Sequence, residues 1–228
     1  MKNVKALNLD YICTGCGACE TICPTNAVKI KLEDAVYKPW VDIEKCIECK
    51  KCINVCPGLA ININKQSKLL FSNQNSINKN ELLPNFNANY TAYSTDTRLR
   101  YEAASGGIAT GILIYLFEEN IIDGAVVTKM DEQDKTKSKT YIAESIEEIE
   151  AAKTSKYCPT HPLSKLKELK KYDKNKRFAF VGLPCHIHGL RKLQEEEKWL
   201  KDKIILTMAL FCTHTVNYKG TEVFLEKL

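Results

Sequence analysis

The sequence predicts an α+β protein with a small cysteine-rich domain at the N-terminus and a larger domain of alternating helices and strands. Eight of the 11 cysteines lie between Cys13 and Cys56, and one cysteine pattern occurs twice in this span. From residue 92 onward, amphipathic segments alternate with short apolar runs that end at turn residues. A chain of 228 residues is long enough for both domains, which we place at residues 1–64 and 92–228, with a linker at 65–91.

The N-terminal domain is built from an internal duplication of a C-x2-C-x2-C-x3-C-P pattern. This spacing is typical of bacterial proteins with two 4Fe-4S clusters, in which the fourth cysteine of each copy binds the cluster of the other copy. The first cluster is therefore assigned to Cys13, Cys16, Cys19 and Cys56, and the second to Cys46, Cys49, Cys52 and Cys23. Residues 1–64 are predicted to form a two-cluster bacterial ferredoxin-like domain.

Structural zinc is the main alternative for closely spaced cysteines. Zinc takes four ligands, whereas each copy here has a third cysteine at the same short spacing and a Cys-Pro in addition. Disulfides are disfavoured because the N-terminus lacks the apolar segment of a secretory signal, so we expect a cytoplasmic protein with reduced thiols. Gly15 and Gly17 lie where a loop around a cluster must bend, and Pro24 and Pro57 end the short helices.

The net charge does not indicate nucleic acid as a partner. Two oxidised clusters on four thiolates each contribute −2, so +5 − 2 − 2 leaves about +1. Lys and Arg alternate with Asp and Glu, as on solvated helix faces. We therefore expect no nucleic acid partner. The sequence also has no apolar run of about 18 residues, so we expect no membrane partner.

The linker is rich in Asn, Ser and Lys, which predicts an exposed connector. Leu69, Leu70 and Phe71 are expected to pack against both domains.

The larger domain is predicted to contain an α/β sheet with helices on its faces. The expected strands are 124–129, 140–145, 177–182 and 204–212, and the expected helices are 105–119, 163–172, 187–197 and 220–228. Ser105 is expected to be the N-cap of the first helix. Ligands of such sheets bind at the carboxyl ends of strands, here the turns after Val181 and Phe211.

Three short segments of this domain are candidate binding sites. Ser105–Gly107 suits a close backbone approach to a phosphate or flavin, but equally an ordinary helix start. Residues 182–185 place Cys185 near a helix N-terminus, where the dipole would lower the pKa of a nucleophilic or metal-binding thiol; a buried structural cysteine is the alternative. Ser155 and Lys156 could contact an anion or belong to a solvated turn. No dinucleotide fingerprint or P-loop is present.

A resemblance extends along nearly the whole chain. After the cysteine repeat, the segments "YEAASGGIATGILIYLFEENIIDGAVV", "TSKYCPT", "RFAFVGLPCHIHGLRKL" and "IILTMALFC" follow in order. Together they resemble the family of coenzyme F-420 hydrogenase/dehydrogenase beta subunits, in the form with an N-terminal two-cluster ferredoxin domain.

The resemblance implies an iron-sulfur flavoprotein oxidoreductase that passes electrons between the two clusters and FAD. It implies a flavin-binding-type α/β domain, with flavin contacts at Ser105, Gly106, Gly107, Thr110, Ser155, Lys156, Gly182, Leu183 and Pro184. Cys185 and Cys212 resemble ligands of a further 4Fe-4S cluster. The implied partners are a redox protein, such as a ferredoxin or a hydrogenase or dehydrogenase subunit, and a hydride carrier such as coenzyme F-420.

The sequence departs from the family pattern at its end. Family members continue past the L-F-C strand and supply another C-x2-C pair, whereas this chain stops at "GTEVFLEKL". The α/β domain is therefore expected to be incomplete. A second function stays open at this point, a non-enzymatic electron carrier of the ferredoxin type whose second domain only docks a redox partner.

Overall fold

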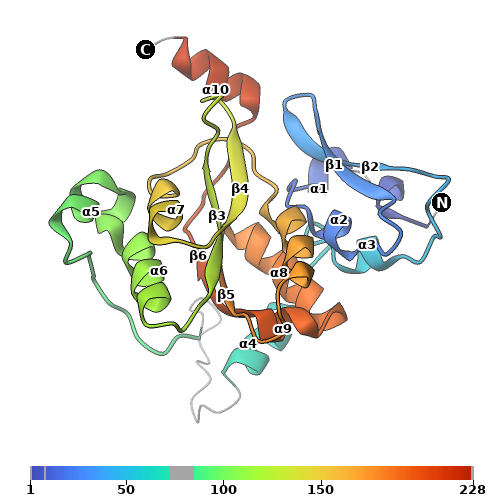
Figure 1. The fold of residues 1–228 in the computed structure, drawn as a ribbon. Helices are drawn as coiled ribbons and strands as arrows, with labels where there is room; N and C mark the ends of the chain where they lie inside the picture. Colours follow the sequence, from blue (N-terminus) through green and yellow to red (C-terminus); the bar gives the residue numbers. More distant parts are fainter. Residues whose placement is uncertain (1, 8, 72–84, 227–228) are drawn as a thin grey trace.

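The structure is a computed structural model that describes residues 2–7, 9–71 and 85–226. Two lobes lie side by side, and α8 lies between the central sheet and the N-terminal lobe (Figure 1). The α+β class and the ferredoxin-like N-terminal region agree with the prediction. In the described ranges, no helix combines the length and apolar character needed to cross a bilayer.

The N-terminal lobe shows the duplication in its backbone. Gly15 and Gly17 have left-handed φ values of 67° and 91°, and the equivalent Glu48 and Lys50 of the second copy have 52° and 62°. Each copy then forms a short helix that contains its third cysteine. The elements of this lobe are η1 (Val4–Ala6), α1 (Leu9–Ile12), α2 (Ala18–Ile22), β1 (Val28–Glu33), β2 (Val36–Val41) and α3 (Lys51–Asn54).

A hairpin that the sequence analysis did not predict joins the two copies. Strands β1 and β2 are antiparallel, with Val28 opposite Val41 and Glu33 opposite Val36. The two turn residues, Asp34 and Ala35, both have left-handed φ values, as a tight hairpin turn requires.

The second lobe is a four-stranded sheet of order β4-β3-β5-β6. Strands β3, β5 and β6 are parallel and β4 is antiparallel, so the carboxyl ends of β3, β5 and β6 share one edge. The strands are β3 (Gly124–Met130), β4 (Ser138–Ala143), β5 (Phe178–Gly182) and β6 (Ile204–Ala209). The helices are α4 (Ile63–Leu70), α5 (Thr97–Glu102), η2 (Ala104–Gly107), α6 (Ile108–Glu118), α7 (Ile146–Ala151), η3 (Pro162–Lys171), α8 (Pro184–Glu196), α9 (Trp199–Lys203) and α10 (Tyr218–Leu225).

Each face of the sheet has its own core. On one face, Leu113 and Ile149 of α6 and α7 pack against Ala125, Val127 and Ala179. The other core joins Phe178 and Phe180 to η3, α8 and α9, and it continues without a break into the N-terminal lobe, where it includes cysteines of α2 and α3. The two lobes therefore fold around a shared apolar core.

Three local expectations differ from the structure. Residues 162–171 form a 3-10 helix rather than an α-helix, because Leu163, Leu166 and Leu169 repeat every three residues and all are fully buried. Residues 63–70 form α4, whose N-cap Asn62 accepts from Lys65 N, in place of an irregular connector. Leu69 and Leu70 are exposed, so they do not pack as expected, and the linker residues 72–84 lie outside the described ranges.

Leu166 tests whether the lobes share one core. We expect Leu166→Ala to lower the free energy of unfolding by about 2–5 kcal/mol, because it leaves a cavity among fully buried neighbours. Leu69→Ala is the control, since this leucine is 56% exposed and the change should stay within about 0.5 kcal/mol. Urea unfolding followed by circular dichroism measures both; equal midpoints would contradict the shared core.

Candidate functional site

The predicted ligands of the first cluster line one cavity. Cys13, Cys16, Cys19 and Cys56 surround it, together with the loop backbone at Gly15 and Gly17. Burial raises the pKa of Cys16 to about 12, although Ala18 N and the Thr14 side chain act in the opposite direction, and it raises the pKa of Cys19 well above its ordinary value. Four converging thiols that are costly to ionise alone fit a positively charged iron-sulfur core.

The predicted ligands of the second cluster gather beside α3. Burial raises the pKa of Cys52, and the charges of Cys49 and Cys23 raise it further, so both cysteines lie near Cys52. Asn3, which is buried, donates from Nδ2 to Cys46 Sγ over 3.4 Å. Cys49 is exposed, whereas Cys16 and Cys19 are buried. This site is therefore the more accessible of the two.

An iron-sulfur cluster and a single metal ion need different arrangements of four thiols. Among the residues that the structure describes, no three His, Cys, Asp or Glu side chains are close enough to hold one metal ion. In a cubane each cysteine binds a different iron, so the four sulfurs surround a volume rather than one point. Structural zinc, the alternative considered from the sequence, needs its four ligands around one point.

The first cluster site lies directly against the second lobe. Leu163 N of η3 donates to Cys16 O over 3.0 Å. On α8, a Cβ added to Gly189 would be 3.5 Å from Cys16 Sγ, so this glycine permits the close approach. The Thr14 side chain lowers the pKa of both Cys16 and Cys185, so it lies close to both thiols. Cys185 is thus adjacent to the first cluster site.

Cys185 differs from the sequence-based expectation in its acidity. Burial raises its pKa, and the helix N–H groups, which lower it, do not compensate. The charge of Cys212 acts on it as well, so the structure brings these two cysteines near each other. Cys212 is exposed in the segment that follows β6.

The Ser105–Gly107 turn adopts a conformation that the sequence analysis did not predict. Ser105, Gly106 and Gly107 have φ values of 51°, 65° and 71°, and α6 begins only at Ile108. Gly107 is the N-cap, so the expected capping role of Ser105 is wrong. Successive left-handed residues turn backbone N–H groups toward one side, an arrangement that suits anions. Thr110 is buried one turn into α6.

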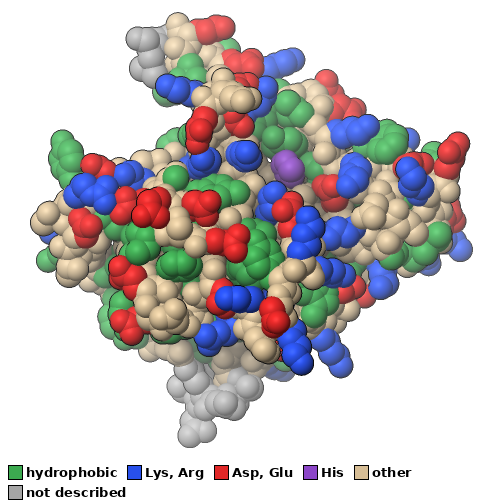
Figure 2. All heavy atoms as spheres, viewed as in Figure 1, with side chains coloured by type: hydrophobic (Ala, Val, Ile, Leu, Met, Phe, Trp, Pro, Cys, Tyr) green, Lys and Arg blue, Asp and Glu red, His purple; other side chains and the backbone are tan. Residues whose placement is uncertain are grey.

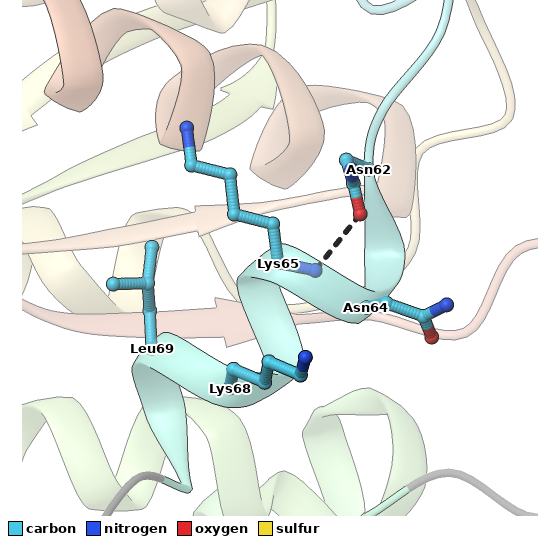
Figure 3. Close-up of a pocket in the computed structure, with 5 residues that line it drawn as sticks. All are labelled: Asn62, Asn64, Lys65, Lys68 and Leu69. Carbon is cyan, nitrogen blue, oxygen red and sulfur yellow. Dashed lines mark hydrogen bonds between the residues drawn. The ribbon is translucent and has the colours of Figure 1, made fainter.

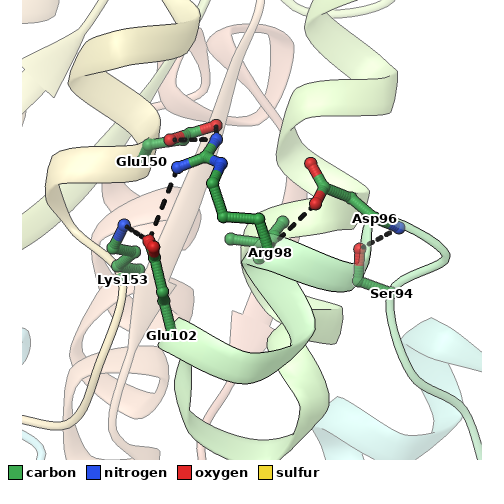
Figure 4. Close-up of polar contacts among 7 residues, drawn as sticks. Ser94, Asp96, Arg98, Glu102, Glu150 and Lys153 are labelled. Carbon is green, nitrogen blue, oxygen red and sulfur yellow. Dashed lines mark hydrogen bonds and ion pairs between the residues drawn. The ribbon is translucent and has the colours of Figure 1, made fainter.

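Two ion pairs connect α5, which precedes this turn, to Glu150 and Lys153, which precede Ser155 and Lys156. Arg98 of α5 pairs with Glu150 of α7 at 2.7 Å, and Lys153 pairs with Glu102 at 2.5 Å (Figure 4). These contacts join the residues just before each of the two candidate segments.

Lys156 itself closes the end of α7. Its Nζ donates to the carbonyl oxygens of Ala152, Lys153 and Thr154, the last over 2.8 Å. Burial lowers its pKa to about 8, so its ammonium group is held in a partly desolvated place.

The third candidate segment lies at the carboxyl end of β5. Leu210 N donates to Gly182 O over 2.9 Å, and Leu183 N donates to His186 Nδ1 over 3.1 Å, with Pro184 as the first residue of α8. This turn therefore leads into the helix that contacts the first cluster site.

A surface hollow beside α4 is separate from these segments. Asn62, Asn64, Lys65, Lys68 and Leu69 line it, and Asn62 caps the helix there (Figure 3). It contains no residue predicted to bind a cofactor. On the face of the molecule drawn in Figure 2, Lys, Arg, Asp and Glu side chains are interspersed, as the sequence analysis expects of solvated helix faces.

Comparisons with known proteins agree with this division into lobes. Residues 12–60 match the 4Fe-4S dicluster domain. Residues 89–167 match the N-terminal part, and residues 175–228 the C-terminal part, of the coenzyme F420 hydrogenase/dehydrogenase beta subunit.

The similar proteins include two curated proteins and one solved structure. An F(420)H(2) dehydrogenase subunit of Methanosarcina mazei is 29% identical over 95% of this chain and 57% of its own length. The coenzyme F420 hydrogenase beta subunit of Methanosarcina barkeri is 32% identical over 60% of this chain and 47% of its own. A chain of the F420-reducing NiFe hydrogenase complex from Methanosarcina barkeri has a TM-score of 0.55 at 28% identity, covering 59% of this chain and 47% of that one.

These matches settle the family. The chain spans about half the length of these curated relatives, 57% of one and 47% of the other. The N-terminal and C-terminal parts of the family pattern follow each other along the second lobe, and the dicluster domain covers both cysteine copies. The chain therefore belongs to the family of coenzyme F420 hydrogenase/dehydrogenase beta subunits and has a 4Fe-4S dicluster domain at its N-terminus.

Proposed function

We propose that this chain is a cytoplasmic iron-sulfur flavoprotein that passes electrons between two 4Fe-4S clusters and FAD. The observation that carries the proposal is the contact between the first cluster site and α8, where Gly189 and Cys185 lie beside Cys16. A cluster adjacent to the second lobe can exchange electrons with a cofactor there. The names of the similar proteins refer to coenzyme F420 hydrogenase and F(420)H(2) dehydrogenase subunits. These names support a role in electron transfer.

The two cluster sites differ in accessibility, and this difference indicates the order in which electrons would pass through them. The second site has the exposed Cys49, and Ile43 and Ile47 beside it are 57% and 64% exposed. A redox partner protein, such as a hydrogenase or dehydrogenase subunit, would dock there. Electrons would then pass through the first site toward Cys185, where Cys185 and Cys212 would contribute to a further cluster.

FAD would bind at the carboxyl edge of the sheet. Three consecutive left-handed residues at Ser105–Gly107 offer backbone N–H groups, and the Lys156 ammonium group lies in the neighbouring segment. Strand β5 ends at Gly182, so the turn Gly182–Pro184 lies at the same edge. FAD supplies the conversion between single electrons and a two-electron hydride, which a hydride carrier such as coenzyme F420 requires.

Flavin content tests this proposal. After anaerobic reconstitution with iron, sulfide and FAD, we expect about one FAD per chain. Gly107→Ala should lower FAD affinity at least tenfold, because its Cβ would be 3.0 Å from Leu99 O at a φ of 71°. Gly111→Ala is the control, since its Cβ would be 3.4 Å from Ser94 Oγ in an ordinary helical position. A chain with about eight irons that binds no FAD would be a ferredoxin-type carrier instead.

A further inference from the structure

Two lysines of the second lobe contact the N-terminal lobe at equivalent places of the duplication. Lys192 Nζ of α8 donates to Cys56 O over 2.8 Å, and Lys167 Nζ of η3 donates to Cys23 O over 2.9 Å. Cys56 and Cys23 are the fourth cysteines of the two copies. The second lobe has no matching repeat, so two unrelated elements each supply a cation to the same position of a repeated unit.

Among the described residues, the hydrogen-bond acceptors of both lysines are uncharged carbonyl and amide oxygens. Lys192 also donates to Ala60 O over 2.8 Å, and Lys167 also donates to Asn26 Oδ1 over 2.5 Å. Within the described ranges, neither lysine forms an ion pair with Asp or Glu. Each positive charge therefore lies against the cysteine backbone without a direct ion pair, although Glu20 lies near Lys167 and Glu195 lies near Lys192.

We propose that these lysines set the reduction potentials of the two clusters separately. Lys192 would act on the cluster of Cys13, Cys16, Cys19 and Cys56, and Lys167 on the cluster of Cys46, Cys49, Cys52 and Cys23. The proposal rests on the clusters of the proposed function. In the reduction step, one cluster gains one electron, and the charge of that cluster becomes more negative by one. A nearby cation stabilises the reduced form more than the oxidised form, so it raises the potential.

A purely structural role is the alternative, in which the lysines only hold the lobes together. Arginine separates the two roles because it is always charged. This matters for Lys167: burial lowers its pKa, although Cys23 and Glu20 act in the opposite direction. An arginine keeps the cation in either case, whereas methionine keeps the length and removes the charge.

A redox titration of the reconstituted chain, followed by EPR spectroscopy, tests the proposal. In Lys192→Met, we expect the ratio of reduced to oxidised first cluster at a fixed potential to fall about tenfold, which is about 59 mV for one electron. The second cluster should keep its potential. Lys167→Met should give the reverse pattern, and both arginine variants should stay near the wild type. Lys176→Met is the control, because Lys176 pairs with Asp123 at 2.8 Å and should shift neither cluster.

Cysteine variants assign the EPR signals to the two clusters, and three outcomes would contradict the proposal. Cys13→Ala and Cys46→Ala identify the EPR signal of each cluster by removing it. The proposal fails if the methionine variants keep both potentials, if each shifts both clusters equally, or if the methionine variants lose iron and the arginine variants lose it as well. The titration needs no flavin, so a chain without FAD still tests the lysines, while a chain without two clusters overturns the proposed function first.

Discussion

A chain with Cys13→Ala and Cys56→Ala should keep about four irons, whereas one with Cys13→Ala and Cys23→Ala should lose both clusters. Both double variants remove two cysteines, but only the first pair belongs to one cluster if the fourth cysteines are exchanged between the copies. The structure supports the exchange. Cys56 lines the cavity of Cys13, Cys16 and Cys19, and Cys23 acts on Cys52.

Iron and acid-labile sulfide, measured after anaerobic reconstitution, read out this prediction. Cys158→Ala combined with Cys13→Ala is a matched control, because Cys158 is buried in the second lobe outside both sites and the loss should equal that of Cys13→Ala alone. If Cys13→Ala/Cys23→Ala keeps four irons and Cys13→Ala/Cys56→Ala keeps none, each copy binds its own cluster and the assignment is wrong.

Gly17→Ala should destabilise the protein by about 2–4 kcal/mol and separate the lobes at the first cluster site. The added Cβ would be 2.6 Å from Ser164 N and 3.1 Å from His161 O, and backbone atoms cannot move aside as a side chain can. The φ of 91° adds strain for any residue with a side chain.

The second copy supplies the control for Gly17→Ala. Lys50 occupies the equivalent position with a φ of 62°, so this copy accommodates a side chain in the left-handed region. Lys50→Ala should therefore change the free energy of unfolding by less than about 0.5 kcal/mol. Urea unfolding with iron content as a second readout measures both. A Gly17→Ala variant with the midpoint of the wild type would contradict the predicted clash with Ser164.

Local patterns in the sequence predict the cluster ligands, but they do not predict the contacts that require glycine at position 17. The cysteine spacing is local, so it predicts the cluster ligands and the ferredoxin-like domain from a few residues at a time. The sequence pattern explains Gly15 and Gly17 by the bend of the loop. The second copy makes the same bend with Glu48 and Lys50, so the glycines reflect in addition the close approach of Tyr37 and Ser164.

Other parts of the site depend on contacts between distant segments, which local patterns do not reveal. In the sequence, Lys167 and Lys192 are ordinary charges on amphipathic helices. Their contacts with the N-terminal lobe are visible only in the structure. The three-residue spacing of Leu163, Leu166 and Leu169 was visible, and it indicates a 3-10 helix more directly than the α-helix that was expected. At Ser105, the residue type favours an N-cap, but the two following glycines allow the turn to continue and Ser94 N binds Gly106 O.

Quantification of iron, acid-labile sulfide and zinc in the anaerobically prepared chain tests the central claim most directly. Two 4Fe-4S clusters predict about eight irons and about eight sulfides per chain, with EPR signals of two clusters after reduction. About two zinc ions with no acid-labile sulfide would contradict the cluster assignment and, with it, the electron path toward the second lobe.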